Sequence, residues 1–173
     1  MTALQNKIKQ IAVSGIFLAV ATLLSYVEAL LPLPIPLPAV RLGLANVAIV
    51  MLIYLYPARY AAAVAVLKCL LVFLLRGNPT ALMLSASGSL LALAVMLLLK
   101  KTDLFSIIGV SVAGAASHVS AQVITSCLLI GSTAAFYYLP YLLLISLITG
   151  SVSGFISSVC VKRFDKVTNI KAQ

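Results

Sequence analysis

Long apolar runs separated by short breaks fill this sequence, and they constrain its fold more than any other feature. Proline, glycine and cations divide the 173 residues into six apolar segments, and 63% of the residues are hydrophobic whereas 9% are charged. Soluble domains hold about 25% charged residues, so a water-soluble fold is excluded. Strand-like alternation is absent, and a helical bundle is then the architecture that satisfies the backbone within a bilayer.

The breaks set the expected boundaries of an all-α integral membrane protein. We predict a six-helix transmembrane bundle that forms a single transmembrane domain over residues 1–173. The expected helices cover residues 10–31, 42–56, 58–75, 80–99, 105–131 and 135–161. Residues 32–38 alternate proline with aliphatic residues and cannot be helical. The second segment is short for a full crossing, and the first is too long for the apolar part of a signal peptide, so we expect it to be a retained helix.

Cations mark one side of the expected bundle. If the amino terminus is cytoplasmic, six crossings place nine of the 12 Lys and Arg residues on the cytoplasmic side. These nine are Lys7, Lys9, Arg59, Lys100, Lys101, Lys162, Arg163, Lys166 and Lys171. Because cytoplasmic loops carry an excess of Lys and Arg, we expect a multi-pass cell-membrane protein with both termini in the cytoplasm.

The chain has few groups for acid, base or metal chemistry. It holds three acidic residues, one histidine and three cysteines, and the cysteines form no C-x-x-C pair. The phosphate loop G-x-x-x-x-G-K-[ST] is absent, so an ATPase of that class would have to be another chain. We expect no catalytic residue, metal site or cofactor here, and the placement of cations between apolar runs argues against a nucleic-acid partner.

Three cations are not assigned to the cytoplasmic side. Lys68 lies roughly 15 Å into the third segment, where a charge costs at least about 2.5–3.5 kcal/mol and usually faces a cavity or a partner. Arg41 and Arg76 lie near outer helix ends, and Glu28 is the only acid on that side. We predict that these four residues form a net-positive outer pocket for an anionic or phosphate-bearing ligand. The alternatives are a structural Lys68–Glu28 pair or a snorkelling lysine, and arginines that contact lipid headgroups.

Polar residues of the fifth segment recur at spacings of four, four and three, which places them on one helical face. They are Gly114, His118, Gln122 and Thr125. We predict a ligand-lining network, which neutral polar residues of the second and fourth segments complete. These are Asn46, Ser85, Ser87 and Ser89. The alternative is a histidine that only makes an interhelical hydrogen bond.

The first segment carries small residues four positions apart, Gly15 and Ala19. Such pairs let two helices approach closely in a membrane. We predict that this surface docks another membrane subunit, and the alternative is packing within the bundle.

Two motifs resemble a known family. The first is Leu42-Gly43-Leu44-Ala45-Asn46 after the proline-rich stretch, and the second is GVSVAGAASH over residues 109–118, followed by Gln122. Both are similar to motifs of the Gx transporter family, also labelled heptaprenyl diphosphate synthase component I. That family resembles the substrate-binding S components of energy-coupling factor (ECF) transporters, and the resemblance covers nearly the whole chain. Val119 departs from the asparagine that commonly follows the histidine in the family, and Lys68 stands where arginine is frequent.

The resemblance implies an S-component fold whose ligand site lies near the outer face, closed by residues 32–40 and 76–79. It also implies that Gly15 and Ala19 dock on a transmembrane coupling subunit served by two cytoplasmic ATPases. The chain would bind a small anionic cofactor precursor or vitamin-like molecule, with isoprenoid or quinone precursors and flavins as candidates. The alternative function is a non-catalytic membrane subunit of a prenyl (heptaprenyl) diphosphate synthase. A third hypothesis is a scaffold whose polar residues serve packing only.

Overall fold

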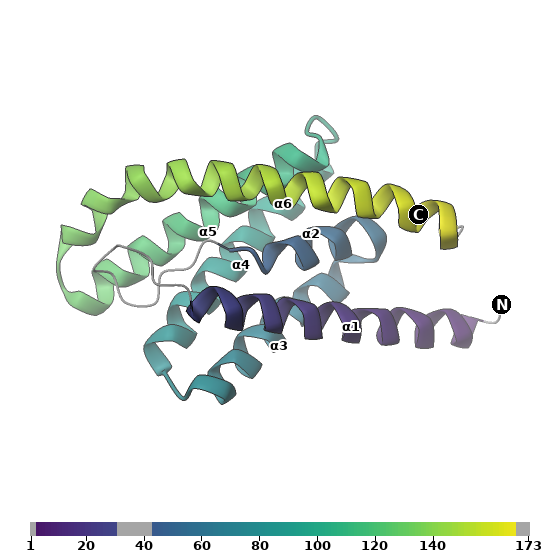
Figure 1. The fold of residues 1–173 in the computed structure, drawn as a ribbon, viewed down its shortest axis with the longest axis horizontal. Coiled ribbons are helices and arrows are strands. Elements are labelled where there is room, and N and C mark those ends of the chain that lie inside the picture. The colour runs from purple at the N-terminus through teal and green to yellow at the C-terminus, as the bar shows by residue number, and fades with distance from the viewer. Residues whose placement is uncertain (1–2, 31–42, 169–173) are drawn as a thin grey trace.

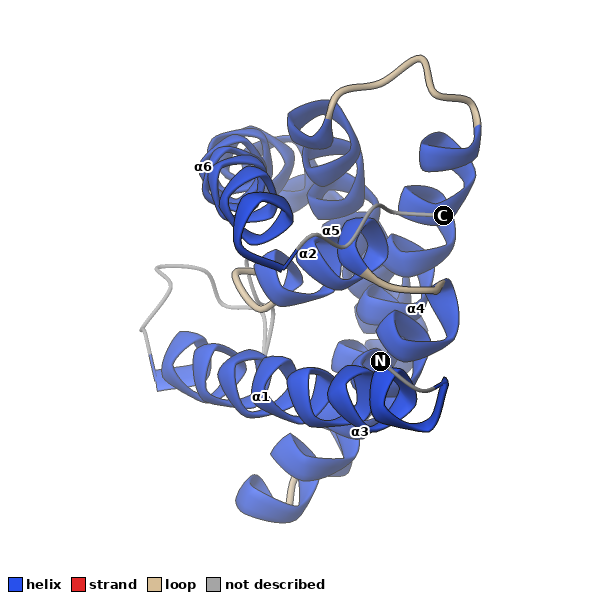
Figure 2. Ribbon diagram, turned by 90° about the vertical axis from the view of Figure 1, so that its right-hand side faces the viewer, coloured by secondary structure: helices blue, strands red, loops and turns tan. Residues whose placement is uncertain are grey.

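The computed structural model of the chain describes residues 3–30 and 43–168. These residues form six α-helices and one 3₁₀ helix, η1 (Figure 1). Their bounds are α1 Ala3–Leu30, α2 Asn46–Leu55, α3 Ala58–Arg76, α4 Pro79–Lys101, α5 Ile107–Ile130, η1 Thr133–Tyr138 and α6 Leu139–Thr168. Figure 2 shows helices and loops without a strand in the described part of the chain. The predicted all-α fold is confirmed for these residues.

Five of these helical stretches are long and apolar enough to cross a membrane. They are Leu4–Glu28, Ala58–Arg76, Pro79–Lys101, Ile107–Ile130 and Thr133–Phe164. The prediction of six crossing helices is not confirmed, because α2 has 10 residues and such a helix is about 15 Å long against a hydrocarbon core of about 30 Å. Several apolar helices of sufficient length are nevertheless the mark of a multi-pass membrane protein.

The breaks explain where helices end. Pro57 follows α2 and lacks the backbone N–H that a continuing helix needs, so the chain turns there and α3 begins at Ala58. Between α3 and α4, Gly77 adopts φ 63° and the side chain of Asn78 accepts a hydrogen bond from the Ala81 N–H at 3.2 Å. The break between the expected helices 58–75 and 80–99 is present, and it is shortened to Gly77 and Asn78.

Several boundaries differ from the prediction: α2 begins at Asn46 instead of residue 42, and α6 ends at Thr168 instead of residue 161. α1 begins at Ala3 instead of residue 10, since its polar first turns contain no Pro or Gly and a helix can extend beyond its apolar part. The predicted helix over 135–161 is divided into η1 and α6. Pro140 lies in the first turn of α6, where its missing N–H removes no helical hydrogen bond.

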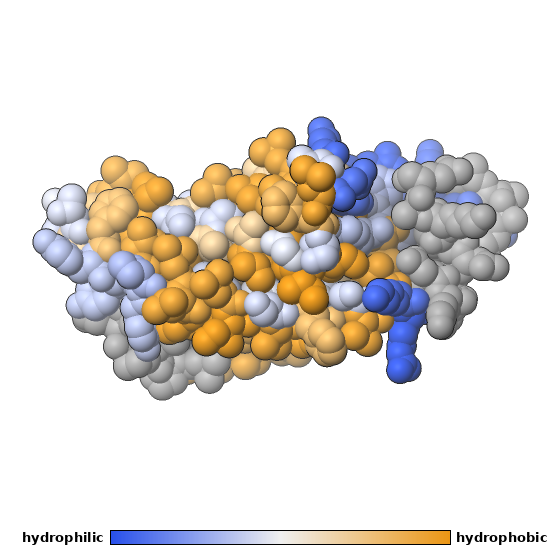
Figure 3. Space-filling view, turned by 90° about the horizontal axis from the view of Figure 1, so that it is seen from above, coloured by the Kyte–Doolittle hydropathy of each residue, from blue (hydrophilic) through white to orange (hydrophobic). Residues whose placement is uncertain are grey.

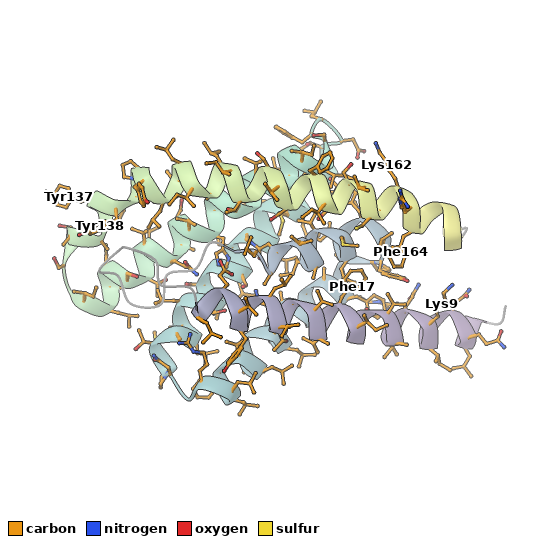
Figure 4. The ribbon with its side chains drawn as sticks, viewed as in Figure 1. Lys9, Phe17, Tyr137, Tyr138, Lys162 and Phe164 are labelled. Atoms are coloured by element: carbon orange, nitrogen blue, oxygen red, sulfur yellow. The ribbon has the colours of Figure 1, made fainter. Side chains whose placement is uncertain are left out.

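The helices α1 and α6 run antiparallel along the bundle, with α2 between them (Figure 1). The start of α1 and the end of α6 lie at the same end, where Phe17 contacts Phe164 with ring centroids 6.4 Å apart. Lys9 and Lys162 lie toward this end, whereas Tyr137 and Tyr138 lie at the other (Figure 4). Apolar atoms dominate the middle of the face in Figure 3, as expected for a surface in contact with lipid tails.

The helix α5 packs against both α4 and α6. Gly150 and Gly154 of α6 face α5 so closely that a Cβ at Gly154 would lie 2.7 Å from Ile108 Cα. The Ser111 hydroxyl of α5 donates a hydrogen bond to the Gly150 carbonyl at 2.9 Å. This small-xxx-small contact, which the sequence analysis did not identify, holds two long helices together and positions the polar face of α5.

Candidate functional site

Six of the eight residues predicted to bind a ligand are buried, each with at most 4% of its surface exposed. They are Glu28, Asn46, Lys68, Ser85, His118 and Gln122. Arg76 is exposed at the end of α3, and Arg41 lies outside the described residues. Arg76 is thus at the helix end where the sequence placed it, and the net-positive outer pocket stays a prediction.

Lys68 and Ser85 lie at the contact between α3 and α4. The Lys68 Nζ donates a hydrogen bond to Ser89 Oγ at 2.8 Å. One turn away, Cys69 Sγ and Ser85 Oγ are 3.5 Å apart. Because Lys68 is 1% exposed, its side chain points into the bundle and does not snorkel to the surface.

The helix α5 contributes His118 and Gln122. Gln122 Nε2 and His118 Nε2 are 3.0 Å apart, as the spacing of four residues predicts. The imidazole lies directly against α4, since a Cβ at Gly88 would be 2.8 Å from His118 Cε1. Only glycine at position 88 lets the ring approach the α4 backbone this closely.

Gly43 connects this imidazole to α1 and α2. Its backbone N–H donates a hydrogen bond to Glu28 Oε1 at 2.5 Å, so the end of α1 is fastened to the turn that starts α2. A Cβ at Gly43 would lie 3.0 Å from Asn46 Nδ2 and 3.5 Å from His118 Cδ2. The residue adopts φ 83°, a conformation that glycine tolerates far better than other residues.

We call these buried residues, together with the two glycines beside His118, the buried polar cluster. It consists of Glu28, Asn46, Lys68, Ser85, Ser89, His118 and Gln122, with Gly43 and Gly88 between them. The cluster draws on α1, α2, α3, α4 and α5 and contains one lysine and one carboxylate. Within the described part of the chain, no group of three His, Cys, Asp or Glu side chains is arranged to hold a metal ion.

The polar stripe of α5 differs from its prediction in one position. Thr125 is only partly buried, whereas Ser126 is 2% exposed and follows Gln122 by four residues. Val119 packs with Val123, Ala135 and Leu142 in a separate apolar cluster. The departure from the family asparagine at Val119 therefore falls outside the buried polar cluster.

The small residues of α1 are open to the surroundings. Gly15 and Ala19 are exposed, and a Cβ at Gly15 would meet no atom within 4 Å. Packing of this surface within the bundle, the alternative hypothesis, does not occur in the described residues.

Sequence reasoning missed the two glycines of the cluster as contacts of His118. A signal for Gly88 was present, since glycine inside a helix destabilises it relative to alanine and usually has a packing reason. Its partner was not evident, because the contact joins residues of two helices 30 positions apart.

An apolar bundle of crossing helices that encloses a charged and hydrogen-bonded cluster defines a class: a polytopic membrane protein with a polar site in its interior. The family model for heptaprenyl diphosphate synthase component I matches residues 17–160, which include the whole cluster. The chain belongs to the heptaprenyl diphosphate synthase component I family, as the sequence motifs predicted. No curated protein and no solved structure matches it.

Proposed function

We propose that this chain is the substrate-binding membrane subunit, or S component, of an ECF-type importer for a small cofactor precursor or vitamin-like molecule. The observation that supports the proposal is the buried polar cluster, which contains Lys68 and His118. Polar and charged groups inside a membrane bundle are expensive and usually serve a ligand, an ion or a partner. Neutral serines and glycines would be enough to pack these helices together, and packing does not require a buried lysine.

The depth of Lys68 strengthens this argument. It is ten residues after Ala58, the first residue of α3, and so about 15 Å along the helix. A cation at that depth costs at least about 2.5–3.5 kcal/mol on insertion scales. A negatively charged ligand would offset part of this cost, so we propose an anionic substrate.

The importer also needs partners. We propose that the exposed Gly15 and Ala19 of α1 dock on a transmembrane coupling subunit, and that two cytoplasmic ATPases drive transport. The chain itself then binds and carries the ligand without catalysis. Isoprenoid or quinone precursors and flavins are the candidate substrates, because an apolar bundle accepts a large apolar or aromatic body.

A second candidate function is a non-catalytic membrane subunit of a prenyl diphosphate synthase, and the name of the family favours it. Affinity purification of the full chain from its native membrane separates the two. Recovery of a coupling subunit with two ATPases supports the importer, whereas recovery of a soluble synthase contradicts it. Mass spectrometry of the small molecule that stays bound through purification then identifies the substrate.

The charge of Lys68 gives a direct test of the site. Lys68→Met keeps the stem of the side chain and removes its charge, and we expect affinity for the co-purified ligand to fall by about 10-fold to more than 100-fold, since a charge-assisted hydrogen bond contributes about 1.5–3 kcal/mol. Lys101→Met, at an exposed position near the end of α4, is the matched control and should bind normally.

A purely structural role for Lys68 predicts a different result. Lys68→Met would then lower the melting temperature, and adding Glu28→Gln would restore it. Unchanged affinity in a stable Lys68→Met protein removes Lys68 from the binding site.

We propose that both termini are cytoplasmic, because the cations gather at the end that carries them. In a variant without Cys69, Cys127 and Cys160, a cysteine at position 137 should react with a membrane-impermeant maleimide on intact cells. A cysteine at position 101 should react only after permeabilisation. The reverse pattern contradicts this orientation.

A further inference from the structure

Asn46 opens the short helix α2 inside the bundle, and its carboxamide has no hydrogen bond in the described part of the chain. The side chain is 2% exposed, and both Oδ1 and Nδ2 are buried without a partner. Buried polar groups are nearly always hydrogen-bonded, so such a group needs an explanation. A Cβ at Gly43 would lie 3.0 Å from Asn46 Nδ2 and 3.5 Å from His118 Cδ2, so Asn46 and the imidazole both adjoin Gly43 in the buried polar cluster.

The backbone around Asn46 has little left to offer a ligand. The Asn46 N–H donates to the Gly43 carbonyl at 2.9 Å, and the Val47 N–H donates to the Leu44 carbonyl at 3.1 Å. The Gly43 N–H already donates to the carboxylate of Glu28. A helix amino terminus attracts anions through free N–H groups, and here the first two N–H groups of α2 are taken and the Glu28 carboxylate is already present.

What stays open is therefore the Asn46 side chain, which offers an acceptor and donors in one plane. Its complement is a planar group that carries a donor and an acceptor side by side. A carboxylate or phosphate would leave Oδ1 unsatisfied, and an ammonium would leave Nδ2 unsatisfied.

We propose that Asn46 is a specificity-determining residue that pairs with an amide-type edge of the substrate, such as a lactam, an imide or a primary carboxamide. The inference rests on the proposed binding function and specifies the chemistry of the same site. It is compatible with a negative charge elsewhere on the ligand, near Lys68.

Three probes of equal size and shape test this pairing. Benzamide presents an acceptor and a donor, benzoate presents acceptors only, and benzamidinium presents donors only. Binding is measured by saturation-transfer NMR on the full chain in lipid nanodiscs, with empty nanodiscs to subtract partition into lipid. We expect the wild-type protein to prefer benzamide over both other probes by about tenfold or more, because a site built for a hydrogen-bonding group rejects analogues that leave its polar atoms unpaired.

Two substitutions make the test specific. Asn46→Asp keeps the shape but replaces the donor with an acceptor, and the preference should shift to benzamidinium. Asn46→Leu should abolish the preference. Asn78→Asp, at the exposed asparagine that precedes α4, is the matched control and should leave the wild-type preference unchanged.

Several results would overturn the proposal. Equal binding of the three probes, or no binding of benzamide at millimolar concentration, shows that the carboxamide recognises no amide edge. If Asn46→Leu keeps the benzamide preference and raises the melting temperature, Asn46 is a structural group. This test is independent of the importer proposal. If ATPases co-purify but benzamide is not preferred, only the inference about Asn46 is refuted. If benzamide is preferred but a synthase co-purifies, only the importer proposal is refuted.

Discussion

Two pairs of small residues four positions apart, one on α1 and one on α6, lie in opposite environments in the structure. Gly150 and Gly154 of α6 lie against the backbone of α5, with no space for a Cβ. Gly15 and Ala19 of α1 are exposed, and Gly15 has no neighbour within 4 Å of a Cβ position. The spacing promotes close helix contact in both cases, so the pattern alone does not indicate whether the contacting helix belongs to the same chain.

The difference shows which small-residue surface is already covered by another helix of this chain. The helices α5 and α6 pack closely against each other, and the hydrogen bond from Ser111 to Gly150 adds to their contact. On α1, Gly15 and Ala19 are exposed in the described part of the chain. We infer that the first contact stabilises the fold, whereas the second is available to a partner.

The largest effect is expected at Gly154. Gly154→Leu places a side chain where even a Cβ would lie 2.7 Å from Ile108 Cα, and backbone atoms cannot move aside cheaply. We expect the stability to fall by about 3 kcal/mol or more, visible as a lower melting temperature and less monodisperse protein after size-exclusion chromatography. Gly15→Leu is the same substitution on α1, and it should change neither the melting temperature nor the monodispersity. A Gly154→Leu protein as stable as wild type would show that α5 and α6 are less closely packed than described.

A smaller effect is expected at Ser111. Ser111→Ala removes the hydroxyl that bonds the Gly150 carbonyl at 2.9 Å, and interhelical hydrogen bonds of this kind contribute about 0.6 kcal/mol on average in membrane proteins. The melting temperature should fall slightly. Ser151→Ala is the control, because the Ser151 hydroxyl bonds Leu147 within its own helix and is exposed. Equal shifts in both variants would show that the α5–α6 bond adds nothing.

Local signals made most of the fold predictable. Apolar length indicated the crossing helices, and Pro57 and the Gly77-Asn78-Pro79 turn fixed two of their ends. The start of α1 and the division between η1 and α6 were not predictable in the same way. Helix ends beyond the apolar run and the choice between 3₁₀ and α geometry depend on neighbouring segments.

In the candidate site, contacts within one helix were predictable from the sequence, whereas contacts between helices were not. The pairing of His118 with Gln122 follows from a spacing of four within one helix. The hydrogen bond from Lys68 to Ser89 and the fit of Gly88 against His118 join different helices, so they require the helix arrangement. Arg76 was grouped with Lys68 because neither is assigned to the cytoplasmic side; the structure places Arg76 at the exposed end of α3 and buries Lys68.

The smallest effect on stability, and the sharpest test of the comparison, is expected on α1. In the double variant Gly15→Leu with Ala19→Leu, both new side chains extend away from the bundle, so the free energy of unfolding should change by no more than about 0.5 kcal/mol. Ligand binding should also be unchanged, because Gly15 and Ala19 are exposed, whereas the residues of the buried polar cluster are buried. Recovery of a coupling subunit in affinity purification should nevertheless fall at least about tenfold, since leucines would separate helices that must approach closely.

The matched control for this surface is Ala94→Leu, which enlarges an exposed small residue of α4. If both variants lose the partner equally, any enlargement of the lipid-facing surface disturbs assembly and α1 has no special role. If the α1 variant retains the partner and transports normally, the exposed Gly15 and Ala19 face only lipid. If only the α1 variant loses the partner while its stability and ligand affinity stay intact, the exposed pair Gly15 and Ala19 serves docking. The buried pair Gly150 and Gly154 on α6 then serves folding.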